Sequence, residues 1–318
     1  MTVAGLQISA EARGAHPPTA GDAPLFLLGA PRSGTSLLYK VLCLHPDVAY
    51  ISNWVRRFPR QPWLGALNRL ARRLPHTQRS VWFGHDSNAY VYASRRALLK
   101  RLFPQPVEGE PVYAACGIPD FVPSGAAPSE QQRDALRAAF RAIRRYAGGT
   151  RIVNKRIGNN LRIPLLEAAF PEARFVDIMR DGRAVAYSLS HVDWWEDTVV
   201  WWYGGTPRRW REEGRDPWEL CARVWLEELR AIDAGLESVP AGQVLRVHYE
   251  QLVREPLPTL RVIAEFAGLR PHPAWASRLA TLRFPDRNER WREGLEPGAV
   301  AHITAIQEER LRRHGYAL

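Results

Sequence analysis

The segment Pro24-Leu-Phe-Leu-Leu-Gly29-Ala-Pro31-Arg32-Ser33-Gly34-Thr35-Ser36-Leu37-Leu38 sets how the first part of this chain folds. The apolar run 25–28 predicts a buried strand, which Gly29 ends. From Thr35 onwards apolar residues recur with helical spacing, as far as residue 42. A strand, a glycine-bounded loop and a helix start direct several backbone N–H groups at one point, where the helix dipole also favours an anion. The segment therefore predicts a phosphate-binding turn.

The residue types of the loop favour the same chemistry. Gly34 lets the backbone approach phosphate oxygens closely, and the hydroxyls of Ser33, Thr35 and Ser36 are possible donors. The nucleotide-triphosphatase pattern G-x-x-x-x-G-K-[ST] fits from Gly29 to Gly34, but Thr35 stands at the lysine position. The cation lies inside the loop instead, at Arg32, whose forked guanidinium suits phosphate. An ordinary strand–turn–helix connection is the alternative.

A second segment repeats this arrangement, from Phe170 through Arg180-Asp-Gly-Arg183 to Leu189. The run 175–179 predicts a short buried strand, 180–183 a turn, and 184–189 the beginning of a helix. Arg180 and Ser188 lie eight residues apart across that turn and could clamp one more phosphate. The alternative is an Arg–Asp pair that decorates an exposed turn.

The two segments together resemble the sulfotransferases that use 3′-phosphoadenosine-5′-phosphosulfate (PAPS). The family's 5′-phosphosulfate loop has a Pro-[Lys/Arg]-Ser-Gly-Thr-[Thr/Ser] core, and this chain has Pro31-Arg-Ser-Gly-Thr-Ser36. Its 3′-phosphate element runs Phe-Pro-x-Ala-x-Phe, an apolar strand, Arg-Asp-x-Arg and a later Ser, which is similar to residues 170–188. The Arg-Asp-Gly-Arg-Ala sequence most resembles the corresponding motif of the tyrosylprotein sulfotransferases and their bacterial relatives.

Three further segments extend the resemblance over about 24–318. Tyr249 stands in a Tyr-Glu-x-Leu segment, where the family places a tyrosine near the adenine. Arg290 begins an Arg-Trp-Arg-x-x-Leu segment similar to the one that helps to close the cofactor site. Lys155, in Asn-Lys-Arg, resembles the lysine-containing stretch ahead of the 3′-phosphate strand.

The resemblance implies in-line attack of an acceptor hydroxyl on the sulfur of PAPS, with 3′,5′-ADP leaving. Arg32, with Thr35, Ser36 and the loop amides, would neutralise charge on the bridging and 5′-phosphate oxygens, assisted by Lys155. Arg180 and Ser188 would hold the 3′-phosphate and so distinguish PAPS from ATP. Arginines and amides supply the positive field, so no metal is expected.

The general base is left open among three residues. Tyrosylprotein sulfotransferases place a glutamate about twenty residues after the loop, but here 50–53 reads Tyr-Ile-Ser-Asn, without a carboxylate. His85 lies at a separation similar to the catalytic histidine of the small-molecule enzymes. Asp86 and His191 are the second and third candidates. The missing glutamate argues against a peptidyl-tyrosine acceptor and favours a small molecule or glycoconjugate.

Composition limits the other possibilities. The chain has 318 residues and a net charge of +11, almost all of it from arginine. The arginines are scattered and no nucleic-acid module is visible, so nucleic-acid binding is not expected. Three cysteines at 43, 116 and 221 without metal spacing favour a reduced, cytoplasmic setting, and no run is long enough to span a bilayer. The rivals are a P-loop kinase or NTPase that uses Mg-ATP, and a non-catalytic nucleotide- or nucleic-acid-binding protein.

The alternation of strands and helices predicts a single α/β domain over 23–318: a central, mostly parallel sheet flanked by helices, with a P-loop-like nucleotide-binding core. Residues 1–22 read as a disordered tail. The ranges 54–128 and 191–215 are expected to be insertions that supply a lid and the acceptor pocket. Within the former, 54–80 reads as an exposed helical insertion and 81–128 as loop-rich. Seven of the twelve tryptophans lie in 194–225, either as core or as walls of that pocket.

Overall fold

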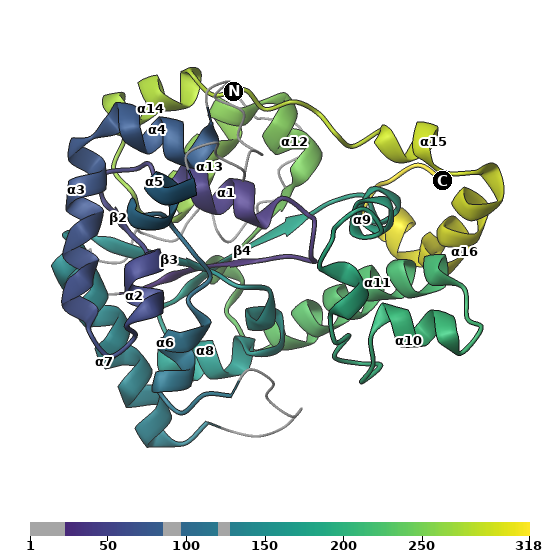
Figure 1. The fold of residues 1–318 in the computed structure, drawn as a ribbon, viewed down its shortest axis with the longest axis horizontal. Coiled ribbons are helices and arrows are strands. Elements are labelled where there is room, and N and C mark those ends of the chain that lie inside the picture. The colour runs from purple at the N-terminus through teal and green to yellow at the C-terminus, as the bar shows by residue number, and fades with distance from the viewer. Residues whose placement is uncertain (1–22, 85–96, 120–127) are drawn as a thin grey trace.

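A parallel sheet forms the centre of the molecule. The computed structural model describes residues 23–84, 97–119 and 128–318. Within them the strand order is β2-β3-β1-β4-β5, and every strand pair is parallel (Figure 1). The strands are β1 Leu25–Leu28, β2 Val48–Ala49, β3 Arg151–Lys155, β4 Arg174–Met179 and β5 Val244–His248. The predicted fold class is confirmed. The sequence also predicts short strands at 151–154 and 243–247, which correspond to β3 and β5, whereas it does not predict the short edge strand β2.

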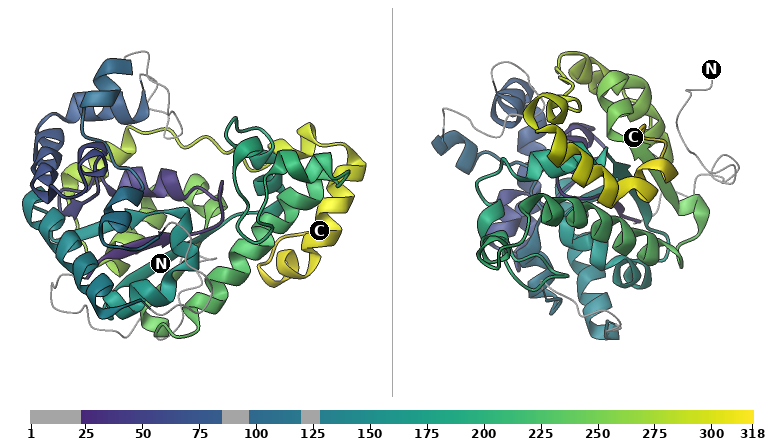
Figure 2. Two further views of the ribbon diagram at one scale, coloured as in Figure 1. Left: turned by 60° about the horizontal axis from the view of Figure 1, so that its bottom comes forward. Right: turned by 90° about the vertical axis from the view of Figure 1, so that its right-hand side faces the viewer.

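Helices cover both faces of the sheet, as parallel sheets require. They are α1 Thr35–Leu42, α2 Asn53–Arg57, α3 Leu67–Arg73, α4 Pro75–Phe83, α5 Ala97–Leu102, α6 Glu110–Ala115, α7 Glu130–Ala147, α8 Ile163–Ala169, α9 Gly182–Leu189, α10 Pro207–Glu212, α11 Pro217–Leu236, α12 Tyr249–Arg254, α13 Pro256–Phe266, α14 Pro273–Ala280, α15 Arg290–Gly294 and α16 Pro297–Arg313. Short 3₁₀ turns are η2 Pro62–Ala66, η3 Ile157–Leu161, η4 Trp195–Asp197 and η5 Ala241–Gln243. Figure 2 shows α9, α11 and α16 packed together at one end of the sheet.

The side chains of β1 enter two different apolar cores. Leu25 and Leu27 belong to the core beneath α1 and α13, whereas Phe26 and Leu28 belong to the core beneath α7 and α8. Successive side chains of a strand point to opposite faces, so one wholly apolar strand fills both cores. β1 is central and buried throughout, which fixes the position of the loop that follows it.

Helix starts follow local capping. Ser129 and Gln132 form a reciprocal capping box at the start of α7, and the Asp216 side chain accepts from the Trp218 N–H at the start of α11. The sequence predicts both starts, from a serine ahead of a glutamate at 129–130 and from an Asp-Pro pair at 216–217. The expected turn at 180–183 is partly wrong, because α9 already begins at Gly182. The Asp181 side chain accepts from the Arg183 N–H at 2.9 Å and so caps the helix two residues earlier.

The 54–128 region is more firmly attached to the domain than an exposed insertion would be. It is helical over 54–80, as expected, but Val55 and Ala71 are fully buried. Arg72 donates to the carbonyls of Val48 and Ala147 at 3.3 and 2.8 Å, which ties α3 to β2 and α7. The loop-rich expectation for 81–128 is partly wrong, since α5 and α6 lie there. Apolar residues of α6, such as Val112, complete the core beneath α7.

The remaining expectations concern the tail, the cysteines and membranes. Residues 1–22 lie outside the described residues. Cys43, Cys116 and Cys221 are buried and free of disulfides. In the described part of the chain, no helix has the length and hydropathy needed to cross a bilayer.

Candidate functional site

A pocket of about 790 Å³ opens at the carboxyl edge of the sheet. Because the strands are parallel, the residues that follow β1, β3, β4 and β5 meet at this edge. The pocket is lined by Pro31, Arg32, Gly34, Thr35, Ser36, Leu37, Glu108, Lys155, Ile157, Arg180, Ala184, Tyr187, Ser188, His191, Val192, Asp193, Trp194, Tyr249, Arg287 and Arg290. The two predicted anion-binding turns therefore open into one cavity, together with Lys155, Tyr249 and Arg290.

The loop after β1 adopts a backbone that suits anion binding. Gly34 has φ 91° and directly precedes α1, so the first N–H groups of the helix point towards the pocket without an intrahelical partner. A Cβ at Gly34 would lie 2.6 Å from Cδ2 of Tyr249. Arg32 has φ 69°, which costs a non-glycine residue about 1–2 kcal/mol. Ser33, which was also predicted to bind the cofactor, is buried and is not among the residues that line the pocket.

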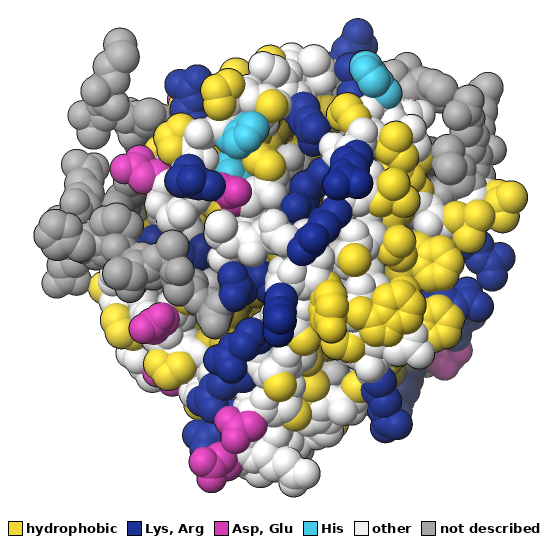
Figure 3. All heavy atoms as spheres, turned by 90° about the vertical axis from the view of Figure 1, so that its left-hand side faces the viewer, with side chains coloured by type: hydrophobic (Ala, Val, Ile, Leu, Met, Phe, Trp, Pro, Cys, Tyr) yellow, Lys and Arg dark blue, Asp and Glu magenta, His cyan; other side chains and the backbone are white. Residues whose placement is uncertain are grey.

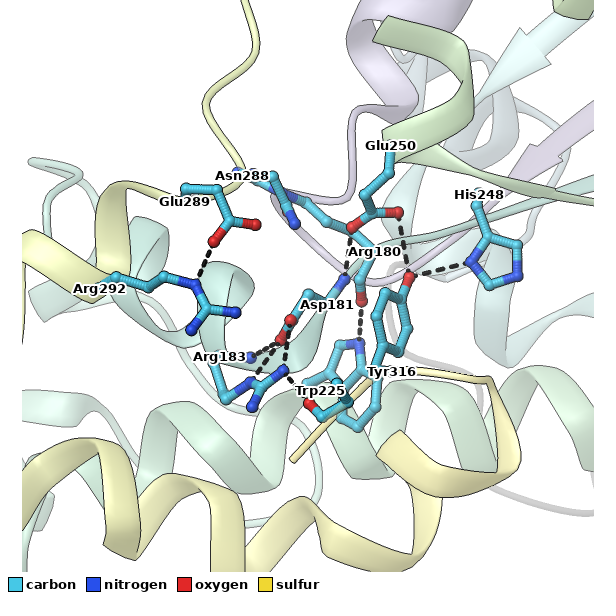
Figure 4. A network of polar contacts seen from close by, with 11 residues as sticks. Arg180, Asp181, Arg183, Trp225, His248, Glu250, Asn288, Glu289, Arg292 and Tyr316 are labelled. Carbon is cyan, nitrogen blue, oxygen red and sulfur yellow. Dashed lines mark hydrogen bonds and ion pairs between the residues drawn. The ribbon is translucent and has the colours of Figure 1, made fainter. Parts of the chain in front are cut away.

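Arg180 connects the two turns. Its guanidinium donates to the Arg32 carbonyl at 2.9 Å, and the Arg32 Nε–H donates to the Ser188 hydroxyl at 2.9 Å. Arg180 also donates to Asn288 Oδ1, the residue labelled beside it in Figure 4, and to the Arg287 carbonyl, at 3.2 and 2.9 Å. These bonds hold the strained Arg32 peptide against the Arg180 turn. The turns lie 148 residues apart in the chain and act as one unit.

A partly buried polar network supports the Arg180 turn (Figure 4). Glu250 accepts from the Asp181 N–H at 3.0 Å and from the Tyr316 hydroxyl at 3.1 Å. Burial raises the pKa of Glu250, and these hydrogen bonds act in the opposite direction. The Trp225 indole N–H donates to the Arg180 carbonyl at 3.1 Å. The C-terminal segment therefore helps to fix the turn, which no local sequence pattern indicated.

A second network holds the beginning of the β1 loop. Asn160 accepts from the Gly29 N–H at 3.3 Å and donates to the Gly29 carbonyl at 3.0 Å, so it fixes that residue's backbone from both sides. The Asn160 amide also donates to Glu228 at 2.6 Å, and the Trp201 indole donates to the other Glu228 oxygen at 3.1 Å. Glu228 is fully buried in α11, and burial raises its pKa to about 7. Sequence reasoning missed both Asn160 and Glu228.

The pocket contains a carboxylate that sequence reasoning also missed. Glu108 forms an ion pair with Lys155, whose side chain is almost fully buried at the end of β3, and the Glu108 side chain is 47% exposed. It lies next to Gly109, whose φ of 77° turns the chain into α6. Nothing in the local sequence distinguishes Glu108 from other surface glutamates. Only the fold brings it to Lys155, 47 residues along the chain.

Of the three residues predicted as the general base, the structure describes only His191. His191 lies at the pocket rim and is exposed, with Nδ1 within 2.8 Å of the Tyr187 carbonyl. His85 and Asp86 lie outside the described residues. Of the tryptophans in 194–225, Trp194 lines the pocket and is half exposed, whereas Trp210 and Trp225 are fully buried in the core beneath α9 and α11. The reading as core therefore applies to Trp210 and Trp225, and the role of Trp194 in an acceptor pocket stays a prediction.

The chain belongs to the sulfotransferase family, whose model matches residues 24–273. The expectation of a sulfotransferase enzyme is confirmed. Carbohydrate sulfotransferase 1 of Danio rerio is 30% identical over 111 residues, which are 33% of this chain and 25% of that protein. The chain therefore matches only a quarter of the length of this curated relative.

Solved structures show the same fold. Sulfotransferase STF9 from Mycobacterium avium aligns with a TM-score of 0.59 at 19% identity, over 97% of this chain and 80% of that one. Sulfotransferase STF1 from Mycobacterium tuberculosis aligns with a TM-score of 0.51 at 16% identity, over 90% and 76%.

Proposed function

We propose that this enzyme transfers the sulfuryl group of PAPS to a hydroxyl of a small-molecule or carbohydrate acceptor. The observation that carries the proposal is that both anion-binding turns open into one pocket at the carboxyl edge of the sheet. The pocket is strongly basic, with Arg32, Lys155, Arg180, Arg287 and Arg290 against the carboxylates of Glu108 and Asp193. A nucleotide with phosphate groups at both 3′ and 5′ matches that excess of positive charge.

The binding roles follow from position in the pocket. The amides at the start of α1, with Thr35, Ser36 and Arg32, bind the 5′-phosphosulfate. Arg180 and Ser188, on the neighbouring turn, bind the 3′-phosphate. The Tyr249 ring lies beside the loop and under the Arg180 guanidinium, 4.4 Å from ring centre to Cζ, and can pack against the adenine. Arg290, in α15, closes the pocket. The pocket fits PAPS, whose sulfate is the group transferred.

Glu108 is the proposed general base. The acceptor oxygen attacks sulfur, the bond from sulfur to the 5′-phosphate oxygen breaks, and the hydroxyl proton passes to the Glu108 carboxylate. Negative charge then grows on the phosphate oxygen of 3′,5′-ADP, where Arg32 and Lys155 stabilise it. Glu108 holds Lys155 before substrate binds, so both groups are positioned in advance. Pro31, Val192 and Trp194 supply apolar wall for the acceptor.

The family relation and Thr35 both argue against the Mg-ATP rival. A thermal-shift panel separates the candidates, because a ligand stabilises the native state according to its occupancy. We expect 3′,5′-ADP to raise the Tm at concentrations where ATP with Mg²⁺ and duplex DNA do not. An equal shift with Mg-ATP would refute the assignment of the pocket to a 3′-phosphorylated nucleotide.

A matched pair of variants tests the pocket. Arg290→Ala removes a pocket arginine, whereas Arg292→Ala removes one in the same short helix that pairs with Glu289. We expect Arg290→Ala to weaken 3′,5′-ADP binding about tenfold or more and Arg292→Ala less than about twofold. Ser188→Ala should weaken 3′,5′-ADP binding more than 5′-AMP binding. Equal losses for both nucleotides would refute the 3′-phosphate role.

The two pocket carboxylates allow a test of the base. Glu108→Gln should lower kcat with labelled PAPS about 10²- to 10⁴-fold while 3′,5′-ADP binding is retained. Asp193→Asn is the control and should retain most of the activity. The opposite result, with Asp193→Asn inactive and Glu108→Gln active, would show that the base is assigned wrongly. An intact acidic limb of the pH–rate profile in Glu108→Gln would show the same.

A further inference from the structure

A second surface, at the β2 edge of the sheet, lies outside the pocket and has a distinctive composition. Between Asp47 and Asp86 the sequence has seven arginines and no acidic residue. The described part of this stretch forms α2, η2, α3 and α4. Six of its arginines are exposed, at positions 56, 57, 60, 69, 73 and 79. We refer to the exposed side chains of these elements and of α5 as the basic surface.

The arginines of the basic surface differ from several on other helices. There, exposed arginines pair with a carboxylate one turn away, as Arg223 does with Glu219 and Arg312 with Glu308. Among the described residues, the six exposed arginines of the basic surface form no ion pair with an acidic side chain. Their positive charge is therefore not neutralised by described carboxylates and is available to an anionic partner.

Exposed apolar side chains lie among these arginines. The described part of the chain has ten exposed large hydrophobic residues, and six of them are in this surface: Phe58, Trp63, Leu70, Leu74, Leu98 and Leu102. Leu98 is 70% and Trp63 is 54% exposed. Figure 3 shows a band of Lys and Arg side chains across this face and a group of hydrophobic side chains beside it.

The elements that carry these residues form one continuous surface. Helices α2, η2, α3 and α4 follow one another and pack in sequence, and α5 packs on α4. The Trp54 indole donates to the Leu102 carbonyl at 2.7 Å, which joins the end of α5 to α2. Arg69 donates to the Arg145 carbonyl at 3.1 Å, which fixes α3 on α7. The arginines and apolar residues are thus held in fixed relation.

We propose that the basic surface binds the face of a membrane that contains anionic phospholipids. Arginines contact the phosphate groups, and the exposed Trp, Phe and Leu side chains enter the boundary between headgroups and acyl chains. Nucleic acid or an acidic polysaccharide would use the arginines alone and leave the six apolar side chains in water. A lipid interface is the partner that satisfies both kinds of side chain.

Vesicle sedimentation tests the proposal with the full chain. The probes are phosphatidylcholine vesicles with and without about 30% phosphatidylglycerol, an anionic fraction large enough to attract basic side chains. We expect binding only to the anionic vesicles, and weaker binding at high salt because surface charges are screened. Arg56→Gln/Arg60→Gln/Arg73→Gln should lower the affinity at least about tenfold. Absence of binding to anionic vesicles would overturn the proposal.

Two controls separate a specific surface from general charge. Arg254→Gln/Arg261→Gln/Arg313→Gln removes three exposed arginines elsewhere and should change the affinity less than about twofold. Trp63→Ser/Leu70→Ser should also weaken vesicle binding at least about fivefold, whereas Val199→Ser, at a residue 66% exposed, should not. Equal losses from both arginine sets would overturn the proposal.

Binding to polyanions is measured in the same way, to distinguish a lipid surface from a nucleic acid or an acidic polysaccharide. If duplex DNA or heparin binds more tightly than anionic vesicles, and Trp63→Ser/Leu70→Ser leaves all binding unchanged, the surface is a polyanion site and the proposal is wrong. The readout is separate from sulfuryl transfer, because all of these variants should bind 3′,5′-ADP as the parent does. Failure here would leave the proposed function intact.

Discussion

Replacing Glu228 by glutamine should remove a pH dependence from the stability of this enzyme. Burial raises the pKa of Glu228 from 4.5 to about 7. Between these two values the folded state binds more protons than the unfolded state. The contribution of Glu228 to stability is therefore fully present below pH 4.5 and is lost as the pH rises through 7. One pKa unit corresponds to about 1.4 kcal/mol.

The size of the effect follows from these two pKa values. From pH 5 to pH 8 the wild-type protein should lose roughly 2 to 3 kcal/mol of unfolding free energy through this one group. A glutamine side chain cannot titrate, so the Glu228→Gln variant lacks the loss. In the variant, the glutamine NH₂ group would face one of the two donors, Asn160 or Trp201, and could not accept its hydrogen bond. The free-energy cost of that lost hydrogen bond is the same at both pH values. The test therefore measures how the difference in unfolding free energy between the wild type and the variant changes with pH.

Urea unfolding at pH 5 and pH 8 measures this quantity, with constant m-values as a check on two-state behaviour. Other shifted groups, such as Asp177 with its pKa raised to about 6, are common to both proteins and cancel. Glu237→Gln, at the exposed end of the same helix, is the matched control. If the difference in unfolding free energy between the wild type and Glu228→Gln is the same at both pH values within about 0.5 kcal/mol, the pKa of the buried carboxyl is not raised as described.

Three further variants test the supports of the two proposed phosphate-binding turns. Gly34→Ala should weaken 3′,5′-ADP binding at least about tenfold, because the backbone at residue 34 has φ 91° and the new Cβ would clash with the Tyr249 ring. Calorimetry measures this affinity, and unchanged binding would contradict the described loop geometry. Asn160→Ala leaves the Gly29 backbone at the head of the loop without two partners, and should cost about 1–3 kcal/mol in urea unfolding and raise the KM for PAPS. Tyr316→Phe removes the hydrogen bond to the partly buried Glu250 and the hydroxyl's contact with His248. It should lower stability by about 1 kcal/mol, and a neutral result would show that the C-terminal segment does not brace the turn.

The predictions that succeeded rest on local physics. The apolar run of β1, the Asp216 cap of α11 and the Ser129 cap of α7 act over a few residues, so their patterns are visible in the sequence. The start of α9 was misplaced because the Asp181 side chain could act either as part of a turn or as a helix cap. The edge strand β2 has two residues, too few for a periodic pattern.

Neighbouring residues were sufficient to predict a parallel α/β fold with two anion-binding turns, because they carry the strand, loop and helix signals. Three contacts of the site depend instead on the folded chain: Glu108 with Lys155, Asn160 with Glu228, and Arg180 with the Arg32 carbonyl. These pairs are separated by 47, 68 and 148 residues. Contacts at such separations follow from the order and parallel direction of the strands, which bring distant loops to one edge, and no local pattern records them.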